Sequence, residues 1–236
     1  MILAADDLHK GCMMKYELLQ NDTVTLDTGV KLFRIRALKS FGNVDKGSLG
    51  GYVAGEDNLS QEGIAWVYDN AQVCGDARVF DASQVFGTAQ VFDNVRVYGD
   101  ARVGDEARVY GTVCVHGNAQ VFGKARVSGN ARVYDEARIY VAAYVYGDAQ
   151  VFGKAKVSDN ARVYDKSWVY DTAWVYDDAQ VFGKARVYNA ARVLGAARVS
   201  GDARVYGDAQ VFGKARVTSE AHVDGHARVH GGALIL

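Results

Sequence analysis

Residues 65–236 repeat one pattern of hydrophobic and polar positions every six residues. Counted from Val67 in steps of six, all 29 positions as far as Ile235 are β-branched, and 27 of them are Val. Two residues before each of these stands a small residue, which is Ala in 25 of the 29 units. Residues two apart on a strand point to the same face, so the Ala and Val of each unit are predicted to point inward. The residue between them then points outward.

A second periodic position predicts a corner after each short strand. Two residues after the β-branched position, Gly occurs at 16 of 28 places, Asp at nine and Asn at one. These residues adopt left-handed backbone angles at the least cost. Val141 and Ser219 are the two exceptions. A short strand and a corner in every six residues predict an all-β solenoid with a narrow, dry centre of Ala and Val.

The unit Ala-x-Val-aromatic-(Gly/Asp)-x, as in ARVYGD at 203–208, resembles that of the hexapeptide-repeat left-handed β-helix superfamily. The segments RIRAL (34–38), GSLGGYV (47–53), NLS (58–60) and AWV (65–67) resemble the start of the bacterial YdcK-type proteins, which are usually called acyltransferases from the repeat alone. The resemblance implies a left-handed parallel β-helix over 65–236. This triangular solenoid has three units in each coil and about nine regular coils, so that residues 18 apart stack.

The amino-terminal part has a different pattern. Residues 15–20, 23–26 and 30–36 are predicted strands, with Asp27-Thr28-Gly29 as the turn of a hairpin. Because the end of a solenoid exposes unpaired strand edges, residues 14–64 are interpreted as an N-terminal β-hairpin cap followed by an irregular first coil. Residues 1–13 are predicted to be a disordered tail.

Composition excludes several classes of function. The net charge is −1, from 27 basic and 28 acidic residues, which disfavours a nucleic-acid partner. No apolar run approaches the roughly 18 residues of a membrane-spanning helix, so no membrane partner is expected. Three widely spaced cysteines (Cys12, Cys74 and Cys114) are typical of a reducing compartment. We therefore expect a cytoplasmic protein of bacterial type.

The resemblance also implies a chemistry to look for. Hexapeptide-repeat acyltransferases are trimers that bind CoA between subunits, use a His as general base and shape the substrate site with a projecting loop. Here no insertion interrupts residues 65–232. His116 is the one candidate base in the middle of the array, with Cys114 on the same outer face. The alternative, which the pattern favours, is that His116 replaces one of the aromatic residues that usually fill its position.

A second group of candidate residues lies near the carboxy terminus. His222, Asp224 and His226 offer two imidazoles and a carboxylate, which are ligand types for zinc or nickel. The alternative is a solvated polar terminus, which the spacing favours because His230 falls on the next side of the prism. No resident metal or cofactor is therefore predicted, and acetyl-CoA or another acyl-CoA is expected only under the acyltransferase alternative.

Aromatic residues form the third candidate feature. Tyr or Phe occupies the outward position after Val in 18 of 28 units. The sequence favours an external ladder in which these rings stack from coil to coil. A partner or subunit contact is the other interpretation, because large exposed aromatics are enriched at interfaces. The candidate binding or interface residues are Tyr144, Trp168, Tyr170, Trp174 and Tyr176.

A longer duplication decides between the functions. AQVFGK recurs at 119–124, 149–154, 179–184 and 209–214, so each copy begins five units after the previous one. Because five units are not a whole number of three-unit coils, successive copies fall on different sides, which does not suit a catalytic site composed on one face. We therefore expect a non-catalytic β-solenoid scaffold or binding rod, with a protein partner or self-association, which the apolar run Ala-Leu-Ile-Leu (233–236) favours. The alternative is a trimeric CoA-dependent acyltransferase.

Overall fold

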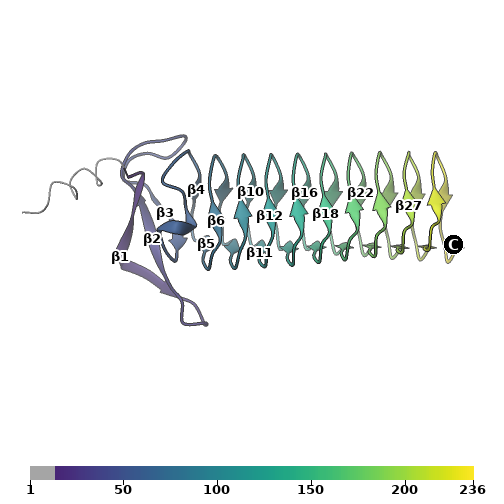
Figure 1. Cartoon of the computed structure of the whole chain (residues 1–236), viewed down its shortest axis with the longest axis horizontal. Coiled ribbons are helices and arrows are strands. Elements are labelled where there is room, and N and C mark those ends of the chain that lie inside the picture. The colour runs from purple at the N-terminus through teal and green to yellow at the C-terminus, as the bar shows by residue number, and fades with distance from the viewer. Residues whose placement is uncertain (1–13) are drawn as a thin grey trace, which may run out of the picture.

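The computed structural model describes residues 14–236 as a rod with a β-hairpin at one end (Figure 1). β1 (Tyr16–Thr25) and β2 (Lys31–Ala37) form the antiparallel hairpin, and β3 (Leu49–Val53) pairs antiparallel with β2. A 3-10 turn, η1 (Glu56–Asn58), follows β3. The disordered tail predicted for residues 1–13 lies outside the described residues.

The rod consists of 29 two-residue strands arranged on three sides. Side 1 contains β5 (Gln72–Val73), β8 (Gln90–Val91), β11 (Arg108–Val109), β14 (Arg126–Val127), β17 (Tyr144–Val145), β20 (Arg162–Val163), β23 (Gln180–Val181), β26 (Arg198–Val199), β29 (Arg216–Val217) and β32 (Leu234–Ile235). Side 2 contains β6 (Arg78–Val79), β9 (Arg96–Val97), β12 (Cys114–Val115), β15 (Arg132–Val133), β18 (Gln150–Val151), β21 (Trp168–Val169), β24 (Arg186–Val187), β27 (Arg204–Val205) and β30 (His222–Val223). Side 3 contains β4 (Trp66–Val67), β7 (Gln84–Val85), β10 (Arg102–Val103), β13 (Gln120–Val121), β16 (Arg138–Ile139), β19 (Lys156–Val157), β22 (Trp174–Val175), β25 (Arg192–Val193), β28 (Gln210–Val211) and β31 (Arg228–Val229).

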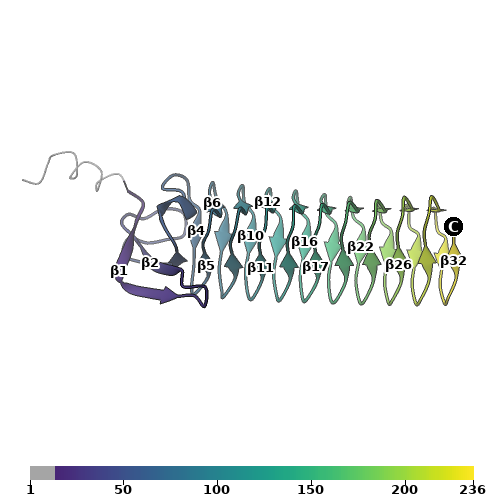
Figure 2. The ribbon, with the colours of Figure 1, turned by 60° about the horizontal axis from the view of Figure 1, so that its bottom comes forward.

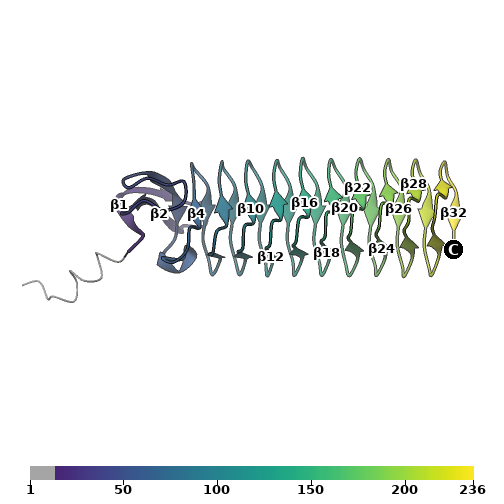
Figure 3. The same cartoon turned by 90° about the horizontal axis from the view of Figure 1, so that it is seen from above.

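Each short strand of the rod pairs in parallel with the equivalent strand of the next coil, three units further along the chain. Val163 of β20, for example, lies between Val145 and Val181. The successive turns form straight rows along the rod in all three views (Figures 2 and 3). The fold is a parallel β-solenoid of about ten turns with an N-terminal antiparallel hairpin. This confirms the predicted fold class and cap, while the left-handed winding implied by the resemblance stays a prediction.

The centre of the rod contains the Ala and Val columns that the six-residue pattern predicted. From Ala65 to Val217, every residue at the two inward positions is fully buried. A buried Val contributes roughly 1.5–3 kcal/mol relative to an exposed one, so these columns dominate the stability of the rod. Ser83 and Ser167 replace Ala, and each hydroxyl donates a 2.7 Å hydrogen bond to a backbone carbonyl three residues earlier.

All 28 predicted corner residues adopt the left-handed conformation, with φ between 54° and 86°. The two exceptional residues do the same, with φ of 62° at Val141 and 59° at Ser219. Asp at a corner has an additional role that the pattern did not reveal. Each of the nine corner aspartates accepts a hydrogen bond from the backbone N–H of the equivalent corner on the next coil, as Asp93 does from Gly111 at 2.9 Å.

The cap differs in detail from the sequence prediction. The two strands expected at 15–20 and 23–26 form one strand, β1, with a bulge between Leu19 and Thr23. Residues 20–22 have no partner in β2 while the residues on both sides of them stay paired, so β1 continues through the point where the sequence pattern indicated a break. Trp66 occupies an outward position, yet it is only 1% exposed because the cap covers it and Phe41 packs edge-on at 5.3 Å.

Two side chains at the start of β1 fasten the cap to the first coil. The buried Lys15 ammonium donates hydrogen bonds to the carbonyls of Ala65 (3.0 Å) and Glu62 (3.2 Å). Burial, with a contribution from nearby Lys39, lowers the pKa of Lys15 to about 8. The Tyr16 hydroxyl donates to the Leu59 carbonyl at 2.6 Å, and burial raises the pKa of Tyr16.

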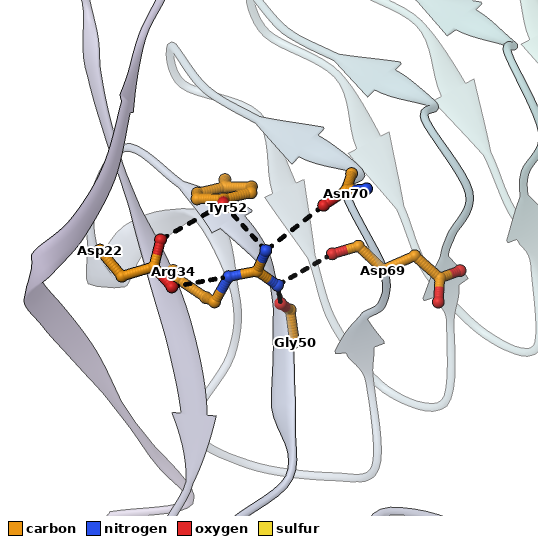
Figure 4. A network of polar contacts seen from close by, with 6 residues as sticks. All are labelled: Asp22, Arg34, Gly50, Tyr52, Asp69 and Asn70. Carbon is orange, nitrogen blue, oxygen red and sulfur yellow. Dashed lines mark hydrogen bonds and ion pairs between the residues drawn. The ribbon is translucent and has the colours of Figure 1, made fainter.

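A third attachment is centred on Arg34 of β2 (Figure 4). Its guanidinium forms an ion pair with Asp22 of β1 at 3.0 Å and donates a 2.7 Å hydrogen bond to the Gly50 carbonyl of β3. It also donates to the Asp69 carbonyl (3.2 Å) and the Asn70 side chain (3.3 Å) at the first corner of the rod. One planar cation therefore connects the hairpin, β3 and the solenoid. No helix among residues 14–236 is long and apolar enough to cross a membrane.

Candidate binding surface

One edge of the rod carries an unbroken column of stacked rings. It runs beside side 2 through eight residues spaced 18 apart: Phe80, Tyr98, His116, Tyr134, Phe152, Tyr170, Tyr188 and Tyr206. Neighbouring centroids are 4.7–5.1 Å apart, and the ring planes lie within 9° of parallel. This is the external aromatic ladder that the sequence favoured.

His116, the candidate general base, is a member of this column. Its imidazole stacks on Tyr98 at 4.7 Å and on Tyr134 at 5.1 Å, so both faces of the ring are covered. Burial lowers the pKa of His116, opposed by the nearby Asp135 carboxylate. Each strand from β4 to β32 begins six residues after the previous one, so no projecting loop overhangs the imidazole.

The three candidate metal ligands do not converge. His222 packs edge-on against Tyr206 at 6.1 Å, and Asp224 accepts a hydrogen bond from the Tyr206 hydroxyl at 3.3 Å. His226 instead lies 3.4 Å from the carboxylate of Asp208 on the preceding coil. Within residues 14–236, no group of three or more His, Cys, Asp or Glu side chains is close enough to hold a metal ion.

The five candidate interface residues lie on three different sides of the rod. Tyr144 belongs to side 1, Trp168 belongs to side 2 with Tyr170 just after it, and Trp174 belongs to side 3 with Tyr176 just after it. They therefore form a band around the rod, and no single side carries all five. Only residues separated by a multiple of 18, which is a whole number of coils, occupy equivalent positions on the same side, and no two of these five are separated in that way.

Three rings of this band, those of Tyr144, Trp168 and Trp174, pack against cations from adjacent coils. Arg126 and Arg162 lie 5.3 and 5.9 Å from the ring of Tyr144. Arg186 lies 4.7 Å from the ring of Trp168, and Lys156 lies 5.5 Å from that of Trp174. Such contacts are worth about 0.5–1 kcal/mol each at exposed sites. The band thus contributes to packing on all three sides.

Side 3 differs because its part of the band lines a cleft. The cleft has a volume of about 480 Å³ and is lined by Glu136, Arg138, Lys154, Lys156, Thr172, Trp174, Ala190 and Arg192. A second hollow of about 250 Å³ adjoins it and shares Arg138 and Lys156 with it. We call the larger hollow the side-3 cleft. In this cleft a candidate interface residue, Trp174, borders an open hollow.

The ring of Trp174 is held in a fixed orientation within the side-3 cleft. Its indole N–H donates a 3.3 Å hydrogen bond to the Ser158 hydroxyl, which in turn donates to the Asp159 carboxylate at 2.9 Å. The ring of Tyr176 packs against the indole, with the two ring centroids 4.5 Å apart. The indole is therefore positioned before any partner arrives, which reduces the entropy lost on binding.

The repeat itself matches a known family model. The YdcK beta solenoid repeat matches residues 71–87, 89–105, 119–135, 125–140, 155–171 and 197–213. The chain is a YdcK-type β-solenoid repeat protein. This confirms the family resemblance noted from the repeat. A search of curated proteins found no match to the sequence.

This YdcK-type solenoid has a further hollow that the sequence did not reveal. Leu26, Thr28 and Val30 at the tip of the hairpin overhang Cys74 and Phe92 beside side 1, and enclose about 340 Å³. Burial raises the pKa of the Cys74 thiol, so this side chain is protonated at neutral pH. No sequence signal predicts this hollow, because it depends on the angle at which the hairpin docks on the rod.

Proposed function

We propose that this YdcK-type solenoid is a non-catalytic scaffold or binding rod whose length and outer surface carry its function. The observation that supports this most strongly is the place of His116 in the aromatic column. A general base needs an open path to the proton that it abstracts. An imidazole stacked between Tyr98 and Tyr134 fills a packing position instead.

The proposal includes a partner and a compartment. The partner is another protein or a second copy of the chain, because Trp, Tyr and Arg are the residue types that dominate binding energy at protein interfaces. These residue types line the outward positions of every side. The rod acts without a bound cofactor, and we place it in the cytoplasm, since its widely spaced cysteines fit a reducing compartment.

A CoA-dependent acyltransferase is the second candidate, and one observation favours it. The lowered pKa of His116 keeps the imidazole neutral at neutral pH, which is the state that a general base requires. Cys114 lies two residues before His116 on side 2. An enzyme of this kind would bind acetyl-CoA and would assemble as a trimer, as the superfamily resemblance implies.

Calorimetric titration with acetyl-CoA, together with the native mass of the assembly, separates the two functions. A monomer or dimer that releases no heat with acetyl-CoA supports the binding rod. A trimer with micromolar affinity for acetyl-CoA overturns it. The variant His116→Phe is the control, because Phe fills the same position in other coils. Loss of a general base would reduce any acyl transfer by about 10²–10⁴-fold, whereas a packing role leaves the background rate unchanged.

A further inference from the structure

The cations on the flat sides of the rod have no acidic partners among residues 14–236. Fourteen Arg and Lys156 occupy the outward position before the buried Val or Ile, and none of them forms an ion pair within the described chain. The ion pairs of the rod lie at its corners, where Lys124 meets Glu106 (3.8 Å), Lys154 meets Glu136 (3.9 Å) and Lys184 meets Asp202 (3.8 Å). The chain therefore places its ion pairs at its edges and leaves the cations on its flat sides without an ion pair.

Several of these unpaired cations lie directly opposite one another. Arg138 is in register with Lys156 on side 3, and the same holds for Arg78 with Arg96, Arg108 with Arg126, Arg186 with Arg204, and Arg198 with Arg216. Like charges directly opposite on neighbouring strands destabilise a sheet. A purely structural rod would gain stability from an alternating charge pattern. An anionic partner would remove the repulsion.

The side-3 cleft gathers these cations around the positioned rings. Arg138, Lys156, Trp174 and Arg192 succeed one another on four adjacent coils, which span about 14 Å at roughly 4.8 Å per coil. Lys154 reaches the cleft from its edge. The only carboxylate in the lining is Glu136, and Lys154 pairs with it. The cleft therefore combines an excess of positive charge with the indole of Trp174.

We propose that the side-3 cleft binds an acidic, extended peptide segment of a partner protein, lying along the axis of the rod. This inference rests on the proposed function as a binding rod and names the class of its partner. A peptide rises about 3.3 Å per residue, so four or five residues span the four coils. Carboxylates pair with the three cations on the coils, and a side chain packs against the part of the Trp174 indole that stays exposed beside Lys156 and Tyr176.

Nucleic acid fits the same surface less well. Duplex DNA carries one negative charge per roughly 1.7 Å, which is nearly three phosphates for each coil of about 4.8 Å. One cation per coil cannot neutralise that density. An acidic peptide has a lower charge density, because its backbone is neutral and carboxylates on one face of an extended strand are about 6.6 Å apart.

Fluorescence anisotropy with a labelled peptide of about eight glutamates tests the proposal, since that length crosses the cleft. We expect the peptide to bind at low salt and an all-glutamine peptide not to bind. The double variant Arg138→Gln/Arg192→Gln should weaken binding about tenfold or more. Gln already fills this outward position on side 3 at Gln120 and Gln210, so the variant preserves the fold. Thermal unfolding checks that it does.

The matched control is Arg102→Gln/Arg228→Gln, which removes the same charge from the same side outside the cleft. Unchanged binding in this control supports the cleft, whereas an equal loss in both double variants overturns it in favour of diffuse attraction. Trp174→Gln should weaken binding and Trp168→Gln, on side 2, should not. Tighter binding of single-stranded DNA or of an acidic oligosaccharide overturns the peptide assignment.

Acetyl-CoA is titrated against the same protein in parallel. Binding of acetyl-CoA by a trimer overturns the proposed function as a whole. If the chain binds neither acetyl-CoA nor the glutamate peptide, only the inference about the side-3 cleft is overturned.

Discussion

Tyr98 and His116 stack with their ring centroids 4.7 Å apart and their planes inclined by 9°. They occupy equivalent positions on successive coils, so each lies directly beside the other along the rod. Parallel stacking at this distance is the geometry of every other neighbouring pair in the column from Phe80 to Tyr206. His116 therefore packs like the aromatic residues of the column. Its contribution can be measured as a change in the free energy of unfolding when it is replaced.

We expect His116→Ala to lower the free energy of unfolding by about 1–3 kcal/mol, because it removes two stacking contacts of roughly 0.5–1.5 kcal/mol each. His116→Phe should change it little, since Phe152 occupies the equivalent position two coils away and stacks in the same way. Chemical denaturation of the two variants and the wild type measures both effects. Equal stability of His116→Ala and His116→Phe would contradict the packing role.

The stability of the rod should depend on the ionisation of His116. Burial holds the pKa of His116 in the folded protein below its ordinary value of 6.5. The stability that this shift contributes is fully present above pH 6.5 and is lost as the pH falls through the lower pKa of the folded state. Wild type should therefore lose stability relative to His116→Phe below pH 6.5. A constant difference between the two down to pH 5 would disprove the shift.

Val141 adopts φ of 62° with a β-branched side chain that is 49% exposed. A left-handed conformation costs an ordinary L-residue roughly 1–2 kcal/mol, and Gly adopts it without that cost. We expect Val141→Gly to raise the stability by about 1 kcal/mol and the melting temperature by about 2–4 °C. Val141→Ala keeps the Cβ in the strained conformation and should gain less. A melting temperature below wild type for Val141→Gly would show that the side chain packs usefully.

Val163 tests the inward assignment. It is fully buried between Val145 and Val181, so Val163→Asp places a carboxyl group in the dry centre of the rod. We expect a loss of about 4 kcal/mol or more, because the carboxyl group finds no polar partner there. Arg162→Asp introduces the same group one residue away on the outer face and should change stability by less than about 1 kcal/mol. Similar unfolding curves for the two variants would refute the assignment.

Arg34 should hold the hairpin on the rod. Arg34→Lys keeps the charge but loses the planar donor geometry that reaches Gly50, Asp69 and Asn70 together. We expect a local loss of about 2 kcal/mol, seen as faster hydrogen exchange in β1 and β2 while the rod stays protected. Arg36→Lys is the control, because within residues 14–236 the Arg36 side chain bonds only to the exposed Glu17 and such pairs contribute little. Equal exchange in both variants would argue against the junction.

The aromatic column shows what a period can predict about side chains. Phe80, His116 and Tyr206 are separated by whole numbers of coils, so their position on one edge follows from counting once three units per coil are assumed. The stacking of their rings also follows, because parallel coils place equivalent residues one coil spacing apart. The same counting places Trp174 between Lys156 and Arg192, and the strand register agrees with it.

The sequence alone determined the inward columns, the corners and the residues that stack, because each depends on a local pattern repeated without interruption. Alternation decides which side chain faces the core, and Gly or Asp decides where the chain turns. The tertiary structure decided the rest: the docking of the hairpin through Arg34, the burial of Trp66 beneath it, and the side-3 cleft around Trp174. These features depend on side-chain orientations and on contacts between segments that share no period, so no six-residue pattern encodes them.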